Sequence, residues 1–448
     1  MLAEVQRRAA LLREDVQTRK LGADQNEDRQ GIHQTQIDTL GSMMDQLLKQ
    51  QNGLLQQLET DLQPRQYAET YAGLLAEIAG TNGLWQVFRY MFEQRRDARI
   101  KRELDAADLV AENCYRPCIT QAREWGLIDG EFREPPLVYL DAELSALTVS
   151  RDAEARSLGM DVGKYLTMRL PIPIIVLPSD QIESFWLFST LHHEVGHNLD
   201  QDLRSRGRGE RLAEELRRRM PALLSAAGAQ ATRRLTWQRW CEEILADAFG
   251  VLLGGAGFGC ALTSLLLPQA ARTAAMQTND THPDNFVRIY LIAAMLRRCN
   301  VPQLTAAADW IQQCWNDVPK PNEVKTYQAE ADAVADLAIT TPLDVLGGRP
   351  LIAIVPKLAT DAQRAQALAD FLAAGGDQPP SGGFPPRLVP AAAQIALTRM
   401  ASPSKQALDN LHAQALDFFY AIELPDFLGA DAPDADFLSQ LTREIRFA

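Results

Sequence analysis

A long uncharged run constrains this chain more than any other feature, because it must leave water when the chain folds. Residues Ala248–Pro268, AFGVLLGGAGFGCALTSLLLP, form a stretch about long enough to span a bilayer. The run contains five glycines and continues directly from a charged segment with Glu242, Glu243 and Asp247. These features favour a buried core helix that is broken at its glycines. A membrane span is the alternative.

Composition limits the classes of protein to which the chain can belong. Its 448 residues suffice for two or three domains, and 46% hydrophobic residues are ordinary for a globular protein. A formal net charge of -13 argues against nucleic acid or an anionic membrane as the main partner. The N-terminus lacks the apolar stretch of a secretory signal, and six scattered cysteines do not suit a disulfide scaffold. We therefore expect a cytoplasmic protein that binds no nucleic acid and is not attached to a membrane.

The N-terminal region, residues 1–63, is polar, with apolar residues at intervals of three and four. Such spacing predicts a helical hairpin or a short coiled coil, although Gly41 and Gly53 weaken the second. Two roles stay open for this region. It binds an activating partner or a second copy of the chain, or it packs against the chain's own body. The apolar positions are Ile37, Leu40, Met44, Leu47, Leu54 and Leu58.

Three further regions follow along the chain. Residues 64–134 are predicted to be helical, and residues 301–448 are predicted to form helices around a Gly/Pro-rich loop. Residues 135–300 contain short apolar runs, among which Pro171–Pro178 predicts a strand. The prolines place this strand at a sheet edge. There it would pair with an extended substrate or belong to the core.

The segment after this strand is predicted to be a helix that carries the sequence HEVGH. Asp180 and Glu183 predict a capping box at its start. His193 and His197 lie one turn apart on one face, where two imidazoles can bind one zinc ion, and Glu194 projects beside the ion where it can hold a water. Apolar residues on roughly the opposite face would anchor the helix in a core: Phe188, Leu191, Val195 and Leu199.

A catalytic zinc site also needs a third protein ligand and an open fourth position. The segment WQRWCEEILADAFG predicts a helix with Glu243 and Asp247 one turn apart. Glu243 can complete a site of two histidines and one glutamate, and Asp247 can accept the free ring N–H of a ligating histidine. Glu242 is a competing ligand, but no carboxylate lies four residues after it. Gly196 leaves room for the close approach of another element.

A third element comes later in the chain, in the segment THPDNFVRIYLI, residues Thr281–Ile292. HExxH, then ExxxD, then His-Pro with a downstream arginine resembles the gluzincin zinc metallopeptidases, in particular those of the HtpX and CAAX prenyl protease type. HExxH alone is moderately specific, whereas three elements in this order are a strong signal. The similarity covers about residues 171–296 and assigns nothing to the two ends of the chain.

This resemblance implies one zinc ion per chain and a role for each motif residue. Glu194 would be the general base, and Asp247 would be the hydrogen-bond partner of a ligating histidine. His282 would help to stabilise the oxyanion, and Arg288 would hold the geometry of the site or assist the same charge. The three zinc ligands would be His193, His197 and Glu243.

The expected fold is α+β and predominantly α-helical, with a zincin-like metallopeptidase core that contains a small sheet and is flanked by helical N- and C-terminal regions. The expected function is that of a zinc-dependent endopeptidase acting on a protein or peptide. The alternative is an interaction or regulatory protein with a structural or vestigial zinc site, in which the N-terminal helices are the working surface. A third hypothesis is a membrane-attached peptidase that uses residues 248–268.

The remaining histidines and one basic stretch give weaker expectations. His192 points away from the metal face of its helix, so we expect it to pack against neighbours. His33 and His412 lie in helical contexts without partners, so we expect them to be solvated. Arg204–Met220 contains the one strong basic cluster. A solvated helix face is favoured there over the steering of an acidic substrate.

Overall fold

The chain is predominantly helical in a computed structural model, as the sequence predicts. The strands within the described residues form one sheet of three strands and two sheets of two strands. The residues that the structure describes are 2–18, 34–60, 63–128, 133–141, 147–149, 166–167, 172–204, 209–272, 276, 278–375, 380, 383–422 and 446–447.

The first half of the chain contains long helices that lead into the sheet and then into the helix with the HEVGH sequence. In chain order these elements are α1 (Leu2–Thr18), α2 (Gln34–Leu58), α3 (Pro64–Gln94), α4 (Lys101–Glu124), β1 (Leu137–Asp141), β2 (Leu147–Val149), β3 (Leu166–Thr167), β4 (Ile174–Pro178), the 3₁₀ turns η3 (Ser179–Gln181) and η4 (Phe185–Thr190), and α5 (Leu191–Asp202).

The second half is almost entirely helical among its described residues. Its elements are α6 (Leu212–Ala226), α7 (Ala231–Arg239), α8 (Cys241–Ala270), α9 (Asn285–Arg298), α10 (Pro302–Asn316), α11 (Val324–Ile339), β5 (Pro342–Leu343), β6 (Arg349–Pro350), η5 (Leu351–Ile354), α12 (Leu358–Ala374), α13 (Leu388–Thr398), α14 (Lys405–Ala421) and β7 (Arg446–Phe447).

The largest sheet has the strand order β1-β4-β2. β1 and β4 are parallel, whereas β2 is antiparallel to β4, with Thr148 opposite Ile175. β4 is therefore the central strand, and the prediction that its prolines place it at an edge is wrong. Pro173 precedes the strand and Pro178 is its last residue, so the residues between them keep the N–H groups that the ladder needs.

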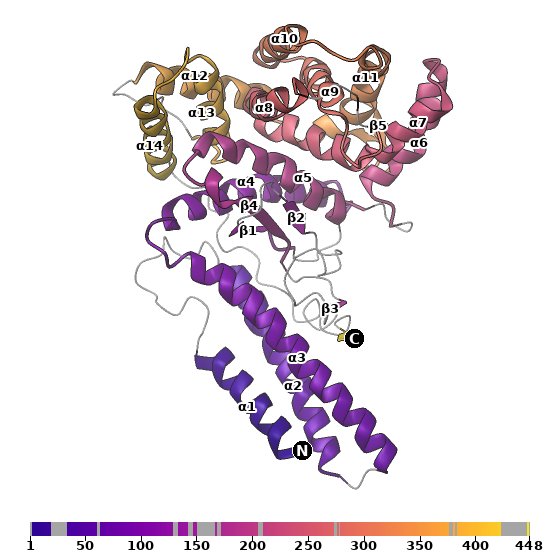
Figure 1. The fold of residues 1–448 in the computed structure, drawn as a ribbon, viewed down its shortest axis with the longest axis vertical. Coiled ribbons are helices and arrows are strands. Elements are labelled where there is room, and N and C mark those ends of the chain that lie inside the picture. The colour runs from indigo at the N-terminus through magenta and orange to yellow at the C-terminus, as the bar shows by residue number, and fades with distance from the viewer. Residues whose placement is uncertain are drawn as a thin grey trace.

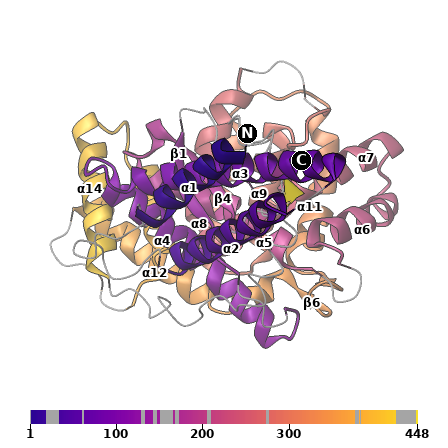
Figure 2. The same ribbon diagram turned by 90° about the horizontal axis from the view of Figure 1, so that it is seen from below.

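The two faces of this sheet belong to two different cores, because successive strand residues point to opposite sides. Tyr139 and Val176 pack with the apolar residues of α1, α2 and α3. Leu140 and Ile175 pack in the main core, which includes α4, α5 and α8. Figure 1 shows α1–α3 extending away from the body on one side of the sheet, and Figure 2 shows these three helices crossing in front of β1 and β4.

The apolar stripe of α2 packs against the chain's own body, which was one of the two roles open for this region. Leu40, Met44, Leu47 and Leu58 are buried in a core that α2 shares with α1 and α3, and Ile37 and Leu54 are partly buried against it. Gln51 interrupts the apolar pattern and is also buried. Its amide donates a hydrogen bond of 2.9 Å to the hydroxyl of Thr81 in α3.

The long apolar run forms most of α8, and the helix is broken at a glycine as predicted. Gly255 has φ 55° and ψ -132°, a backbone conformation that glycine adopts without strain. Among the described residues, α8 is the one helix long and apolar enough to cross a membrane, and most of it is buried inside the protein. Its burial agrees with a core helix.

The helix with the HEVGH sequence begins later than predicted. Asp180 lies in η3, and η4 separates it from α5, which starts at Leu191. The capping box predicted for Asp180 and Glu183 is therefore wrong. η4 is a 3₁₀ turn in which Phe185 and Phe188 are buried with their rings in contact.

The C-terminal region contacts the helices of the site through Arg387, at the end of its Gly/Pro-rich loop. The Arg387 guanidinium donates to Asp361 at 2.5 Å and to the carbonyl of Leu253 at 3.2 Å, two residues before the break in α8. The Arg387 carbonyl lies 2.9 Å from His192 Nε2. This part of the loop therefore wraps onto the body of the protein.

Candidate metal centre

The site is built where α5 crosses α8, and Gly196 makes the crossing close. A Cβ atom at Gly196 would lie 2.9 Å from the Cα and carbonyl oxygen of Ala246 in α8. The predicted role of this glycine in close approach is confirmed. The opposite face of α5 is anchored as predicted, since Leu191, Val195 and Leu199 are fully buried.

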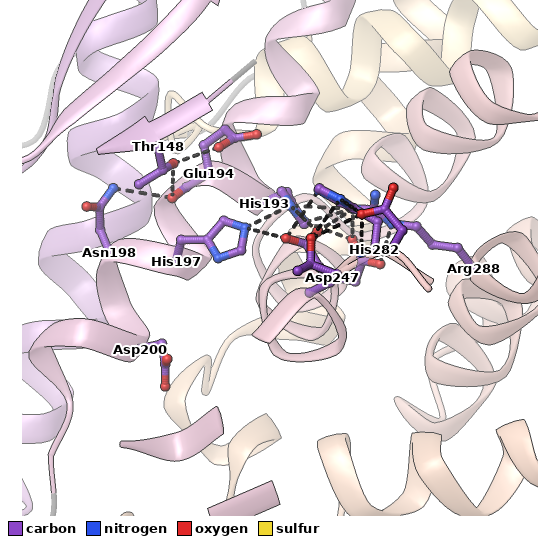
Figure 3. Close-up of polar contacts among 12 residues, drawn as sticks. Thr148, His193, Glu194, His197, Asn198, Asp200, Asp247, His282 and Arg288 are labelled. Carbon is purple, nitrogen blue, oxygen red and sulfur yellow. Dashed lines mark hydrogen bonds and ion pairs between the residues drawn. The ribbon is translucent and has the colours of Figure 1, made fainter. Parts of the chain in front are cut away.

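Three predicted ligands meet at this crossing (Figure 3 shows the two histidines on the same helix). The Nε2 atoms of His193 and His197 are 3.1 Å apart. The carboxylate of Glu243 places Oε2 3.4 Å from His193 Nε2 and Oε1 3.4 Å from His197 Nε2. Among the described residues these three side chains form the one group of histidine, cysteine and carboxylate ligands able to hold a metal ion.

The three donors fit zinc in type and in spacing. Zinc–nitrogen and zinc–oxygen bonds of about 2.0–2.2 Å at tetrahedral angles put neighbouring donor atoms roughly 3.3 Å apart. The separations of 3.1 and 3.4 Å match that spacing. In addition, Glu243 Oε2 is buried and has no hydrogen-bond partner within the described part of the chain. A bound cation would satisfy this oxygen.

Behind the donors, a second carboxylate and a guanidinium hold the first histidine. Asp247 Oδ1 lies 2.8 Å from His193 Nδ1, which leaves Nε2 directed at the metal position. Arg288, from α9, donates to both oxygens of Asp247 at 2.7 Å. Its Nη2 atom is also 3.6 Å from Glu243 Oε2. Asp247, which belongs to α8, thus links His193 of α5 to Arg288 of α9.

Charges in this buried cluster shift the pKa of several groups. Burial opposes a charge on His193, but Asp247 and Glu243 outweigh it and raise the pKa of the imidazole to about 10. Burial and the neighbouring His193 lower the pKa of His197. Burial disfavours the charged form of Glu243, but the two histidines and Arg288 hold its pKa well below the usual range. Without metal, His193 is therefore charged and His197 neutral at neutral pH.

His282 lies at the rim of the site. Its Nε2 atom is 3.4 Å from Glu243 Oε1, and its side chain is 55% exposed. It also lines a cavity of 210 Å³ together with Asp280, Asp284 and Asn285. The third sequence element is thus brought to the metal position, with His282 facing solvent and Arg288 buried behind the ligands.

Glu194 lies beside the histidines and is held by a residue that the sequence did not reveal. The hydroxyl of Thr148, on β2, is 2.6 Å from Glu194 Oε2 and 3.0 Å from the Glu194 carbonyl oxygen. Figure 3 shows Thr148 directly across from Glu194. No local motif signals Thr148, because it comes 46 residues earlier and reaches the site only through strand pairing.

The competing ligand Glu242 points elsewhere. Its carboxylate accepts hydrogen bonds from Arg211 at 2.9 Å and from Arg217 at 3.3 Å. Other arginines of the basic stretch are paired too, since Arg218 bonds Glu210 and Arg219 lies 2.6 Å from Glu215. The positive charge of the described part of this stretch is thus largely neutralised by neighbouring carboxylates.

For the histidines outside the site, the structure agrees with one expectation and contradicts another. His192 is fully buried, as expected, and burial lowers the pKa of its imidazole to about 4. His412 is not simply solvated, because its Nδ1 accepts the N–H of Phe185 and its Nε2 lies 3.6 Å from Glu103. The expectation for His412 is therefore wrong. His33 lies outside the described residues.

Comparison with known proteins adds no family to these observations. No protein-family model, no curated protein and no solved structure matches the chain. What the chain does must therefore be argued from the donor set, its surroundings and the order of its motifs.

Proposed function

We propose that the protein is a zinc-dependent endopeptidase of gluzincin type with a zincin-like core. The observation that carries this proposal is the meeting of His193, His197 and Glu243 at one point, with Glu194 next to the two histidines. A structural zinc site has four protein ligands and needs no carboxylate base beside it, whereas a hydrolytic site has three ligands and an open position.

Zinc held by these three residues would lower the pKa of a water in the open position to about 7 and would polarise a carbonyl group. Glu194 would take a proton from the water that attacks the peptide carbonyl carbon, and would then deliver it to the amide nitrogen that leaves. The carbon–nitrogen bond breaks as the new carboxylic acid forms, so the reaction consumes one water and needs no further reagent.

Two other residues would support this chemistry in different ways. His282 is exposed at the rim, next to Glu243, so its imidazole is available to hydrogen-bond the oxygen that gains negative charge. Arg288 is buried and donates to both oxygens of Asp247. We assign it to holding Asp247 and His193 in place, since these donors are already engaged.

The substrate we propose is a protein or peptide bound in an extended conformation. Among the described strands, β2 lies at an edge of the largest sheet, and it carries Thr148 against Glu194. An extended chain that pairs with the outer edge of β2 would lie over the base. Pairing with the substrate was predicted for the strand Pro171–Pro178, but β4 is paired on both sides. We therefore assign substrate pairing to β2.

Location and partners are also part of the proposal. We place the protein in the cytoplasm, because all six cysteines are free thiols, as is usual in a reducing compartment. We propose further that contacts of the N-terminal helices with a partner or a second copy regulate access to the site. The exposed Leu11 of α1 is a candidate contact.

Glu194→Gln tests the function most directly, with Glu242→Gln as the matched control on the neighbouring helix. We expect wild type and Glu242→Gln to cleave an unbiased peptide mixture in the presence of zinc. Glu194→Gln should retain one zinc ion per chain and lose at least about 10²-fold in rate. The measurements are mass spectrometry of the peptides and zinc content of the protein.

Each outcome of that experiment has a distinct meaning. Full activity of Glu194→Gln would refute the proposed mechanism. Zinc binding without cleavage by any variant would favour the second candidate, an interaction protein with a structural or vestigial metal site. That candidate retains support from the extension of α1–α3 away from the body (Figure 1).

A further inference from the structure

Among the described residues outside the sequence motifs, Thr148 makes the closest hydrogen bond to the proposed base. Its hydroxyl is 2.6 Å from Glu194 Oε2. Strand register explains how it arrives there, because Thr148 is opposite Ile175, whose side chain packs in the core that contains α5. Residues directly opposite each other in a sheet share a face, so Thr148 is directed at α5. A register shift of one residue would turn it away.

We infer that Thr148 is a positioning residue that orients the carboxylate of Glu194 for proton transfer, an inference that rests on the proposed function. A glutamate side chain on a helix has several rotatable bonds, and only some of its conformations face the reacting water. A 2.6 Å hydrogen bond from a strand fixes one oxygen of the carboxylate. The other oxygen is then the one left to accept the proton.

The hydroxyl has one hydrogen and two acceptors, and this arrangement keeps Glu194 held throughout the reaction. While Glu194 is a carboxylate, Thr148 donates to Oε2. When the other oxygen of Glu194 carries the proton taken from water, Oε2 is the carbonyl oxygen of the acid and can still accept the hydrogen bond from Thr148. The main-chain carbonyl oxygen of Glu194, 3.0 Å away, is a second acceptor for the same hydroxyl. The contact survives both states, and no proton is gained or lost by Thr148.

The same contact links the edge strand to the base. β2 carries Thr148, which contacts the base, and its edge away from β4 would pair with the proposed extended substrate. Positioning of this kind affects the catalytic step rather than substrate affinity, so kcat should change while KM does not.

The test compares Thr148→Val, which keeps the shape and removes the hydroxyl, with Thr148→Ser, which keeps the hydroxyl. Thr263→Val is the matched control, because the buried hydroxyl of Thr263 donates only to Gly259 of its own helix. We expect Thr148→Val to lower kcat about tenfold, a part of the 10²–10⁴ that a positioned base contributes. KM, zinc content and melting temperature should not change, and Thr148→Ser should restore kcat to within about threefold.

A second measurement does not depend on turnover. A peptide hydroxamate binds the metal and also hydrogen-bonds the adjacent base, whereas a peptide thiol binds the metal alone. Thr148→Val should weaken hydroxamate binding by about the same factor as kcat and leave thiol binding unchanged. Thr148→Ser should restore hydroxamate binding.

The outcomes separate this inference from the proposed function. If wild type cleaves peptides and Thr148→Val equals it in kcat and hydroxamate affinity, the inference fails and the function stands. If wild type cleaves nothing, the function fails, and the hydroxamate–thiol comparison alone decides the role of Thr148. If valine and serine variants lose zinc or melting temperature equally, Thr148 is structural and the inference is overturned.

Discussion

His193 lies between two carboxylates of the centre. Its ring lies between Asp247 at 2.8 Å on Nδ1 and Glu243 at 3.4 Å on Nε2. These carboxylates overcome the burial of the ring and raise its pKa to about 10. A proton on Nε2 occupies the position that a metal ion would take, so metal and proton compete for the same atom.

Zinc binding should therefore release a proton from His193. At pH 6 the metal-free ring is charged, because its pKa of about 10 lies well above that pH, whereas His197, whose pKa is lowered, contributes little. A water in the open position keeps both protons at pH 6, since its pKa is about 7. We expect close to one proton released per zinc ion, measured by titration calorimetry in buffers of different ionisation enthalpy.

The sign of the pH dependence follows from the same proton. Up to about pH 6.5, well below the pKa of about 10, the apparent zinc affinity should increase about tenfold per pH unit. Above about pH 7 it should increase more steeply, because the water in the open position then also releases a proton. Asp247→Asn removes one of the charges that hold the proton, so it should reduce both the proton release and this slope. Zinc binding with no proton release at pH 6 would mean that His193 is neutral in the metal-free protein.

At this scale the sequence predicts the residues that sit one helical turn apart and misses those that arrive from elsewhere. His193, His197, Glu243 and Asp247 follow from spacing within two helices, and the structure brings them together. Thr148 depends on the register of a three-residue strand, which the sequence pattern does not reveal.

At the scale of elements, the crossing of α5 and α8 decides whether the ligands meet, because each helix supplies part of the donor set. Gly196 permits this crossing, and Gly257 does the same where α8 meets α13, with a hypothetical Cβ only 2.3 Å from Ala391. The glycines within the apolar run therefore bring helices close together in a core. This use of glycine suits a packed helix better than a membrane span.

Gly196→Ala should weaken both the fold and the metal site. Alanine normally stabilises a helix by about 1 kcal/mol relative to glycine. Here the added Cβ would meet the backbone of Ala246 at 2.9 Å, so α8 must move away, at a cost of roughly 1–3 kcal/mol. Zinc affinity should fall as well, because Glu243 moves with α8. Chemical unfolding and a zinc competition assay measure the two effects.

Gly41→Ala in α2 is the matched control, because a Cβ there has no atom within 4 Å among the described residues. It should stabilise the protein by about 0.5–1 kcal/mol and leave zinc affinity unchanged. If Gly196→Ala behaved like Gly41→Ala, the close approach of α5 and α8 would not be needed for the metal site.

Elements were predicted well where periodicity alone defines them and poorly where packing decides. The helices α3 and α4 and the break in α8 follow from apolar spacing and glycines. The order of the strands does not, because Pro178 suits either an edge or the last position of a central strand. The start of α5 at Leu191 does not follow from the sequence either, because the apolar spacing of Phe185 and Phe188 in the 3₁₀ turn also suits an α-helix.

For the whole molecule, the sheet couples the N-terminal helices to the metal centre. One face of β4 contributes Val176 to the core of α1–α3, and the other contributes Ile175 to the core that contains α5. Deleting α1 and α2 would therefore expose a buried face, and a loss of function after such a deletion would not identify a binding surface. Single substitutions separate the two roles.

Leu40→Asp and Leu11→Asp distinguish packing of the N-terminal helices from binding of a partner. Leu40 is fully buried, and an unpaired carboxylate there should lower the stability by about 3 kcal/mol or more. Because both cores meet at the sheet, zinc release and loss of helical signal should move together to lower temperature. Leu11 is 53% exposed, so Leu11→Asp should leave the melting temperature nearly unchanged. If Leu40→Asp melted the N-terminal helices but left zinc bound, the region would fold independently of the metal centre.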